Sequence, residues 1–342
     1  MIKTAVVILN WNGKRFLEEF LPILIKNTQN QEAEIVIADN NSKDGSIDFL
    51  NDNYPDLRQI CFDQNYGFTG GYNRALKQIE AKYFVLLNSD IEVTPNWLTP
   101  LVEILDSDNS IAACQPKIKA FNQKDHFEYA GAAGGYMDKY GYPFCRGRIL
   151  DVIEQDVDQY NEQQDIFWAT GACLAIRADL YKKLGGLDDD FFAHMEEIDM
   201  CWRLKNQGYR VVCNPASTVY HVGGGTLPNN SPFKLYLNFR NNLFLLYKNL
   251  PIGKLYPIMF SRMILDGASA LIFLVKLSFS SFYAVLRAHI SFYKSLRKLR
   301  IKRKKLLYEK VVNHHKEIYP RSIVIDYFLR KKRQFSTLEF KN

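Results

Sequence analysis

Three short apolar runs in the first ninety positions each end in polar residues. The runs are 6–9 (Val-Val-Ile-Leu), 35–38 (Ile-Val-Ile-Ala) and 83–87 (Tyr-Phe-Val-Leu-Leu). Because the apolar residues occupy successive rather than alternate positions, these runs predict central strands that are covered on both faces. The polar residues that follow them directly are Asn10, Asp39, Asn88, Ser89 and Asp90.

These polar residues have two interpretations. Ligands of an open parallel α/β sheet bind beyond the carboxyl ends of its strands, where such side chains gather. Asn, Asp and Ser are also ordinary turn and helix-capping residues, which explains any one of them equally well. Because three predicted strands end in this way, a ligand site at one edge of the sheet is favoured.

Helical patterns separate the predicted strands. Apolar residues recur at helical spacing within 15–26, and a second helix is expected over 47–53 with Ser46 as its N-cap. The remaining elements of this half are a strand at 57–61, helices over 72–81 and from 96, and a strand at 111–114. This alternation predicts an α/β fold with an open, mainly parallel twisted sheet and helices on both faces.

The part that follows, 116–250, is less regular. Residues 116–165 are rich in Gly, Tyr and Asp, and we expect a long functional loop there. Strands are expected at 167–176, 211–213 and 218–220, and helices from 179, over 196–207 and over 232–250. We therefore expect one domain over 1–250, made of the halves 1–115 and 116–250, and a helical C-terminal region over 251–342.

The C-terminal region combines apolar segments with basic charge. Residues 255–286 are strongly apolar, but Arg262, Asp266 and Lys276 interrupt them. No charge-free stretch reaches the ~20 residues that a spanning helix needs. The pattern favours amphipathic helices lying at a membrane interface, and helices packed on the domain or on a second copy of the chain are the alternative.

Positive charge is concentrated after residue 290. Residues 291–342 carry 16 Lys and Arg against 4 Asp and Glu, a net +12, so the overall +7 leaves −5 for residues 1–290. The cluster at 294–305 directly follows the apolar segments, which is typical of binding to an anionic membrane surface. Because no nucleic-acid-binding motif accompanies the charge, nucleic acid is not an expected partner.

The cysteines and the first residues of the sequence indicate the cellular compartment of the protein. The six cysteines are scattered and form no CxxC pair, which argues against a structural zinc site and favours reduced thiols in the cytosol. The first residues lead straight into a predicted strand, and no secretory signal is expected. Both features predict a cytoplasmic protein.

Further acidic, glycine and histidine residues are candidates for chemistry. The loop 65–73 leads into a helix, where glycines let the backbone approach a ligand and the helix start favours negative charge, although a plain tight turn explains it as well. Asp90 is placed to hold a hard divalent cation. The acids of 196–199 open another helix, where stabilisation of the helix dipole accounts for one or two of them. His221 precedes glycines at 223–225.

In order along the chain, these motifs resemble the inverting family 2 glycosyltransferases of the GT-A fold, in the group of bacterial rhamnosyltransferase-like enzymes. The resemblance extends over roughly residues 4–245 and leaves the last hundred residues uncovered. The matching segments are 6–13, 38–46, 65–73, 86–93, 170–177, 185–188 with Phe191 and Phe192, 196–203 and 220–224.

The resemblance implies roles for individual residues. Asp39 would contact the nucleotide base, with the other donor-binding residues being Asn10, Asn41, Asn65, Gly67, Gly71, Asn73, Asn88 and Ser89. Asp90 would be the metal-binding acid of a D-x-D-like motif whose first acid is here Asn88, and His221 would complete a site for Mg²⁺ or Mn²⁺. Glu197 would be the catalytic base, and Asp199 would position the acceptor.

The implied reaction is sugar transfer from a nucleotide-diphosphate sugar, such as one carrying rhamnose. The acceptor would be a saccharide or lipid-linked saccharide in cell-surface polysaccharide biosynthesis, met at the cytosolic face of the bacterial inner membrane. The implied mechanism is a metal-dependent single displacement with inversion. A non-catalytic nucleotide-binding scaffold at the membrane is the alternative, which the presence of Asp90, Glu197 and His221 disfavours.

Overall fold

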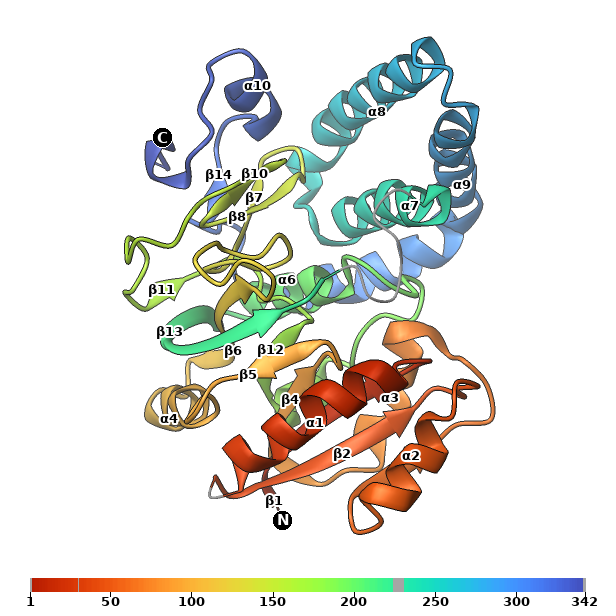
Figure 1. Cartoon of the computed structure of the whole chain (residues 1–342). Coiled ribbons are helices and arrows are strands. Elements are labelled where there is room, and N and C mark those ends of the chain that lie inside the picture. The colour runs from red at the N-terminus through yellow and green to blue at the C-terminus, as the bar shows by residue number, and fades with distance from the viewer. Residues whose placement is uncertain (1, 30, 224–230, 341–342) are drawn as a thin grey trace.

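The centre of the molecule is a twisted, mixed sheet. The computed structural model describes residues 2–29, 31–223 and 231–340. The strand order is β11-β13-β6-β12-β4-β1-β2-β3, and β5 pairs with β13 (Figure 1). The strands are β1 (Ile2–Asn10), β2 (Ala33–Asp39), β3 (Arg58–Cys61), β4 (Ala81–Leu87), β5 (Ile91–Val93), β6 (Ile111–Ala120), β11 (Gln164–Asp165), β12 (Cys173–Arg177) and β13 (Arg210–His221).

Strand direction brings the candidate residues to one edge. Strands β3, β2, β1 and β4 are parallel. β12 is antiparallel to β4 and to β6, while β13 is parallel to β6. The carboxyl ends of β1, β2, β4 and β13 therefore lie on the same side of the sheet, and β12 begins there. This confirms the predicted α/β fold and its mainly parallel sheet.

Helices cover both faces of the sheet, as predicted. On β1, Val6 and Ile8 belong to one buried cluster and Ala5 and Val7 to another. This explains why β1 is apolar at successive positions. One face is covered by α1 (Lys14–Thr28), α2 (Ser46–Asn53) and α4 (Thr99–Ser107), and the other by α3 (Gly67–Lys77), α5 (Ala178–Lys183) and α6 (Glu196–Asn206).

Several predicted boundaries were wrong. α3 begins at Gly67 rather than at residue 72, so the glycines belong to the helix. Ser46 is the first residue of α2, and Gly45, in a left-handed conformation, precedes it as the N-cap. The two short strands expected at 211–213 and 218–220 are one strand, β13, with an irregularity between Asn214 and Thr218.

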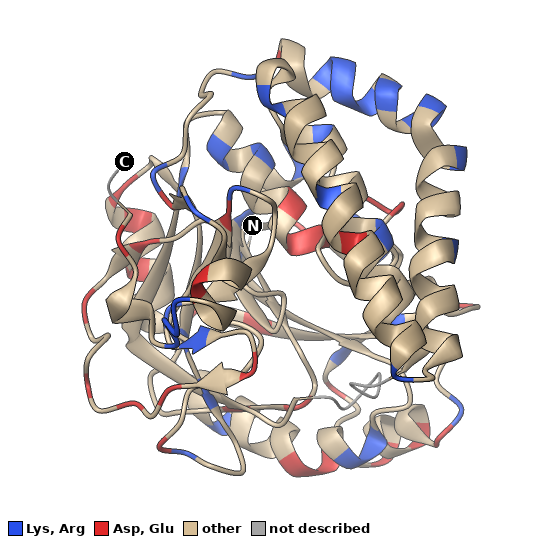
Figure 2. Cartoon of the chain, turned by 90° about the horizontal axis from the view of Figure 1, so that it is seen from above, with Lys and Arg blue, Asp and Glu red and all other residues tan. Residues whose placement is uncertain are grey.

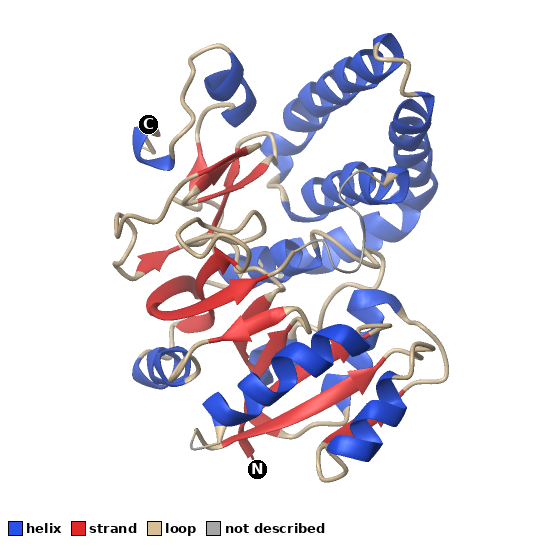
Figure 3. Cartoon of the chain, viewed as in Figure 1, coloured by secondary structure: helices blue, strands red, loops and turns tan. Residues whose placement is uncertain are grey.

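The segment expected to be a long loop forms most of a second, small sheet. Its order is β10-β9-β8-β7-β14. Its short strands are among those drawn red in Figure 3. The strands are β7 (Gly135–Asp138), β8 (Pro143–Cys145), β9 (Arg148–Ile149), β10 (Val152–Ile153) and β14 (Ile318–Tyr319). Strands of two to four residues are too short to show a periodic pattern, which explains the wrong prediction. Because β14 comes from the end of the chain, this sheet joins the C-terminal region to the body.

Long helices dominate the C-terminal region. α8 and α9 form a hairpin beside α7 (Figure 1). Arg262 and Asp266 of α8 are buried; Arg262 Nε lies 2.7 Å from Asp266 Oδ1, and His289 Nε2 of α9 lies 3.1 Å from Asp266 Oδ2. The helices are α7 (Pro232–Asn249), α8 (Ile252–Val275), α9 (Phe279–Tyr308), α10 (Ile323–Phe328) and the 3₁₀ turn η1 (Phe335–Thr337).

Burial of these charges leaves the outer face of α8 apolar. Among the described residues, α8 is the one helix that is long and apolar enough to cross a membrane by length and composition, and most of it is exposed. From the sequence alone, Arg262 and Asp266 look like interruptions of the apolar segment. In the structure both side chains are buried, so they do not interrupt the exposed apolar face of α8.

Candidate active site

Asn10 and Asp39 meet at the carboxyl ends of β1 and β2. Asn10 Nδ2 donates to Asp39 Oδ2 over 2.9 Å, and the backbone N–H of Ser42 donates to Asp39 Oδ1 over 2.8 Å. Asn10 Oδ1 is buried and has no hydrogen-bond partner among the described residues. A Cβ at Gly13 would lie 2.5 Å from Asn10 Oδ1 and 3.3 Å from Ser89 Oγ, so only glycine fits beside these two side chains. The unpartnered acceptor fits a ligand that donates a hydrogen bond.

Asn40, which sequence reasoning missed, fixes the neighbouring loop. Its Nδ2 donates to Asn65 Oδ1 over 2.9 Å and to the Gly67 carbonyl over 3.1 Å, and its Oδ1 accepts the Tyr66 backbone N–H over 2.9 Å. The predicted residue Asn41 instead has a positive φ and accepts from Lys43 Nζ. Two asparagines follow Asp39 in the sequence. Only their contacts in the structure show that Asn40, rather than Asn41, fixes the neighbouring loop.

The glycines of α3 serve close packing. Gly67 has a φ of +71°, and a Cβ there would lie 2.6 Å from the Phe192 ring. A Cβ at Gly71 would lie 2.7 Å from Leu9. The backbone N–H groups of Phe68 and Thr69 donate to the Phe192 carbonyl over 3.0 and 3.3 Å. These two donors at the start of α3 are therefore occupied within the protein.

Asn73, which was expected in the nucleotide site, is also engaged within the protein. Its Nδ2 donates to the Leu187 carbonyl and to Asp189 Oδ1, each over 2.7 Å. Its Oδ1 accepts from Tyr181 Oη over 2.7 Å. Asn73 thus joins α3 to the 181–189 segment, and its amide has little capacity left for a ligand.

Asp90 and His221 lie together, as the sequence analysis expected. His221 Nε2 is 3.2 Å from Asp90 Oδ1 and 3.5 Å from Asn88 Nδ2, and His221 Nδ1 is 3.4 Å from Glu128 Oε1. Burial works against a charged His221, but Glu128 and Asp90 raise its pKa to about 10. Burial also works to raise the pKa of Asp90, yet His221 holds it below its ordinary value. The structure brings Glu128 into this cluster, and no sequence motif had marked it.

These residues fit a hard divalent cation by chemistry. Carboxylate and amide oxygens are the ligands that Mg²⁺ and Mn²⁺ prefer, and a protonated His221 would have to release its proton to bind. In the part of the chain that the structure describes, no three His, Cys, Asp or Glu side chains are arranged to hold an ion. An ion at Asp90 would therefore take further ligands from outside the protein, as Mg²⁺ does from substrate phosphates.

Glu197 lies in the first turn of α6, close to Glu196. Its Oε2 is buried and has no hydrogen-bond partner in the described part of the chain, and burial raises the pKa of its carboxyl to about 7. Burial raises the pKa of the adjacent Glu196 well above its ordinary value, and the charge of Glu197 adds to this effect. A carboxyl that titrates near neutral pH suits proton transfer, and sequence reasoning had not foreseen this shift.

The turn that precedes β12 places Glu197 near Phe68 at the start of α3. A Cβ at Gly171 would lie 3.1 Å from the Phe68 ring and 3.9 Å from Glu197 Cβ. The Asn88 backbone N–H donates to the Ala172 carbonyl over 2.9 Å, which ties this segment to the Asp90 strand end. The structure thus gathers Glu197 and the beginning of α3 around the 170–172 turn.

Asp199, expected to position the acceptor, lies in the interior of the protein. Its carboxylate is fully buried and accepts from Arg203 Nε over 2.8 Å, Lys248 Nζ over 2.9 Å and Asn249 Nδ2 over 2.8 Å. With no exposed surface, Asp199 has no access to an acceptor in this structure. Its geometry fits an anchor for α6.

Comparison with known proteins identifies the family. Residues 5–185, more than half of the chain, match the family described as "Glycosyl transferase family 2". The chain belongs to this family and is a glycosyltransferase, as the sequence analysis predicted.

Two curated relatives are identical to the chain at about a quarter of the aligned positions. It is 24% identical over 234 residues to the N-acetylglucosaminyl-diphospho-decaprenol L-rhamnosyltransferase of Mycobacterium tuberculosis, covering 63% of this chain and 75% of that protein. It is 25% identical over 227 residues to the O-antigen biosynthesis protein RfbC of Myxococcus xanthus, covering 64% of this chain and 17% of that protein.

Solved structures of low identity share the fold. S. aureus TarS 1–349 in complex with UDP-GlcNAc superimposes with a TM-score of 0.57 at 16% identity, covering 90% of this chain and 87% of that one. GalNAc-T7 with UDP, GalNAc and Mn²⁺ superimposes with a TM-score of 0.56 at 18% identity, covering 72% and 48%. The predicted GT-A fold is confirmed.

Proposed function

We propose that the protein transfers a sugar from a nucleoside-diphosphate sugar to a saccharide or lipid-linked saccharide acceptor, by a single displacement that inverts the anomeric carbon. The observation that carries the proposal is Glu197, a half-buried side chain whose Oε2 is buried without a partner among the residues that the structure describes and whose pKa is raised to about 7. Glu197 would take the proton from the acceptor hydroxyl as that oxygen attacks the sugar.

The donor side would be built from the β1, β2 and β4 ends. Asn10 and Asp39 would receive the base and ribose, supported by the free Oδ1 of Asn10. Asn41 and Ser89 would line the same corner. The start of α3 would form one side of this donor site, shaped by the packing of Asn65, Gly67 and Gly71. Asn73 would hold α3 in place.

We propose Mg²⁺ or Mn²⁺ as the cofactor, held by Asp90 and His221 with Asn88 and Glu128 beside them. Bound there, the ion would neutralise negative charge on the leaving nucleoside diphosphate. The support is the chemistry of this donor set and the Mn²⁺ present in the structures of GalNAc-T7 and of a mannosyltransferase from Pyrobaculum calidifontis.

The acceptor class rests on the relatives. The mycobacterial relative is named a rhamnosyltransferase acting on N-acetylglucosaminyl-diphospho-decaprenol, and RfbC is named for O-antigen biosynthesis. We therefore propose rhamnose as a donor sugar to test first, and a lipid-linked saccharide in cell-surface polysaccharide synthesis as the acceptor.

We also propose that residues 1–250 form the catalytic domain and 251–342 a region that meets the cytosolic face of the inner membrane peripherally. Exposed apolar residues along α8 and α9 support this, among them Tyr256, Phe260, Leu271 and Phe279. Lys and Arg residues gather on the long C-terminal helices (Figure 2). Packing of this face on a second copy of the chain is the alternative.

The test is product analysis with a panel of nucleotide sugars and the Glu197→Gln variant. The wild-type protein should form product with at least one donor, and the variant should be about 10²–10⁴-fold slower because it cannot accept the proton. Donor binding, measured by calorimetry, should be retained in the variant. Equal turnover by both proteins would contradict the role of Glu197, and donor binding without product across the panel would favour the scaffold alternative.

A further inference from the structure

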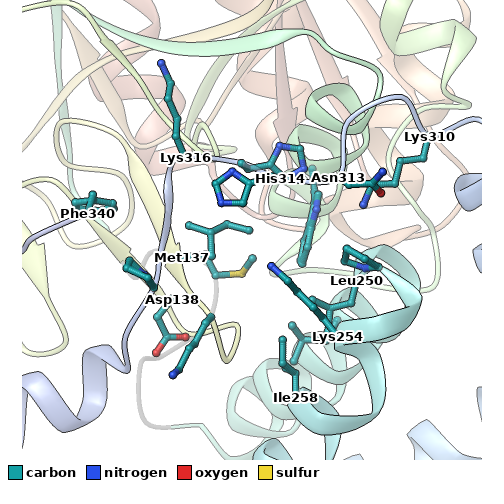
Figure 4. A pocket seen from close by; sticks show the side chains of 17 residues that line it. Met137, Asp138, Leu250, Lys254, Ile258, Lys310, Asn313, His314, Lys316 and Phe340 are labelled. Carbon is teal, nitrogen blue, oxygen red and sulfur yellow. The ribbon is translucent and has the colours of Figure 1, made fainter. Parts of the chain in front are cut away.

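A cavity of about 340 Å³ lies apart from the sheet edge just described. It is enclosed by the small sheet, the junction of α7 and α8, and the segment that follows α9 (Figure 4). Met137, Leu250, Ile258 and Phe340 provide apolar lining. The polar lining is mostly basic and includes Lys139, Lys254, Lys310, His314 and Lys316.

Two buried donors of the cavity have no hydrogen-bond acceptor within the described ranges of the chain. One is the indole N–H of Trp202, which lines the cavity. Lys310 Nζ is likewise buried and unpartnered. Asp138 is the one carboxylate in the lining, and its oxygens already accept the backbone N–H groups of Tyr140, Tyr142 and Ile323 over 2.9, 2.9 and 3.0 Å. Unmet donors on several sides favour a ligand rich in acceptors.

The positive charge around the cavity also favours a ligand rich in hydrogen-bond acceptors. Lys316 pairs with Asp165 over 2.8 Å, but Lys254 and Lys310 have no carboxylate within ion-pair distance among the described residues. Burial, Arg303 and Lys254 lower the pKa of Lys310 to about 8. Neighbouring positive charges repel each other, and an anion bound between them would stabilise their charged forms.

We propose that this cavity binds the phosphate group of an anionic ligand, with an adjoining apolar part lying against Met137, Leu250 and Ile258. Trp202 and Lys310 would donate to the phosphate, and Lys254 would add charge from α8. Two sources share this chemistry: a lipid headgroup and a free phosphate compound. A lipid is favoured by position, because Lys254 and Ile258 belong to α8, whose exposed apolar residues Tyr256 and Phe260 stand beside them in sequence.

This site is separate from the proposed sugar-transfer site, so the two can be tested independently. Binding to the full-length protein would be measured by calorimetry and tryptophan fluorescence. The probes are dihexanoyl phosphatidic acid, dihexanoyl phosphatidylcholine and inorganic phosphate. We expect saturable binding of phosphatidic acid. Lys254→Gln/Lys310→Gln should weaken it at least about tenfold, because two charge-assisted contacts are lost.

Controls keep the test decisive. Lys304→Gln/Lys305→Gln removes two exposed charges of α9 outside the cavity and should leave the affinity unchanged. Trp202→Phe keeps an aromatic ring but removes the N–H, and should weaken binding while abolishing its share of the fluorescence change. Phosphatidic acid binding far better than phosphate would assign a lipid, and equal binding would assign a free phosphate compound. No saturable binding of either anion, or equal affinity in the Lys254/Lys310 and control variants, would overturn the proposal.

Discussion

Lys248 Nζ of α7 lies 2.9 Å from Asp199 Oδ1 of α6, and both side chains are almost wholly removed from solvent. Lys248 also pairs with Asp188, and Asp188 pairs in turn with Lys302 of α9. Burial works to raise the pKa of Asp188, but Lys248 and Lys302 hold it well below its ordinary value. A buried chain of charges thus joins the C-terminal helix α9 to the helix that carries Glu197.

Removing one member of this chain should destabilise the protein. We expect Lys248→Met to lower the free energy of unfolding by up to about 3–5 kcal/mol, because it removes the buried cation that Asp188 and Asp199 share and leaves Lys302 and Arg203 as their remaining charged partners. Urea denaturation followed by circular dichroism would measure the change. Lys304→Met, an exposed residue of α9, is the matched control and should have almost no effect. Equal stability of the two variants would show that Asp188 and Asp199 find other partners.

Asp199→Asn should separate an anchor from a catalytic group. We expect it to lower stability clearly, because Arg203 and Lys248 lose a charged partner. At a temperature where both proteins are folded, its turnover should fall far less than that of Glu197→Gln. Steady-state kinetics beside thermal unfolding would decide this. Full stability with turnover as low as that of Glu197→Gln would contradict the anchor role.

Activity should depend on pH through Glu197. Its pKa is raised from 4.5 to about 7, and a base must be unprotonated, so kcat/KM should rise with pH through about 7. Stability should change in the opposite direction. The folded pKa lies above the unfolded one, so the contribution of Glu197 is fully present below about 4.5 and is lost as pH rises through about 7. Glu197→Gln should remove both dependences, and an unchanged acidic limb in that variant would assign it to another group.

The sequence predicted the central sheet because its strands are long, apolar and separated by periodic helices. Val6 and Val7 face opposite layers, which a run of successive apolar residues indicates directly. The positions of the strand ends could be predicted from the sequence. These ends place Asn10, Asp39 and Asp90 at one edge of the sheet. Asn40 and Glu128 were missed because their roles depend on tertiary contacts that no local pattern encodes.

The C-terminal region was harder to predict for a similar reason. Arg262 and Asp266 look like interruptions of an apolar segment, yet they pair with each other, and Asp266 also contacts His289 of α9. Part of the basic cluster is also engaged within the protein, since Lys298 pairs with Asp190 and Lys302 with Asp188. Charge counts alone cannot separate these lysines from those that face outward.

The packing of Gly67 against Phe192 can be tested by adding one methyl group. We expect Gly67→Ala to cost about 1–3 kcal/mol, because it combines a left-handed φ with a Cβ only 2.6 Å from the Phe192 ring. Gly253→Ala is the matched control, since nothing lies within 4 Å of its Cβ, and it should be neutral or slightly stabilising. Unfolding curves and donor affinity would be compared. Equal values for the two variants would show that α3 shifts freely away from Phe192.

The exposed face of α8 gives the membrane proposal its sharpest test. Phe260, Ile264 and Leu271 are 69%, 58% and 62% exposed, so changing them to Ser should leave the fold intact. If this face enters a bilayer, the triple variant should bind anionic liposomes at least about tenfold more weakly, because burial of each side chain contributes about 1.5–3 kcal/mol. Ile153→Ser/Val157→Ser removes exposed apolar residues of the small-sheet region and is the control.

Salt separates the two contributions to this binding. Charge attraction from outward basic residues should weaken as salt rises, whereas apolar insertion of α8 should persist. Co-sedimentation at increasing salt would therefore show a residual bound fraction in the wild-type protein that the α8 triple variant lacks. A wild-type protein that stays in the supernatant at low salt would contradict the membrane proposal. If it also sediments as a dimer in analytical ultracentrifugation and the triple variant as a monomer, the α8 face is a contact between two copies of the chain.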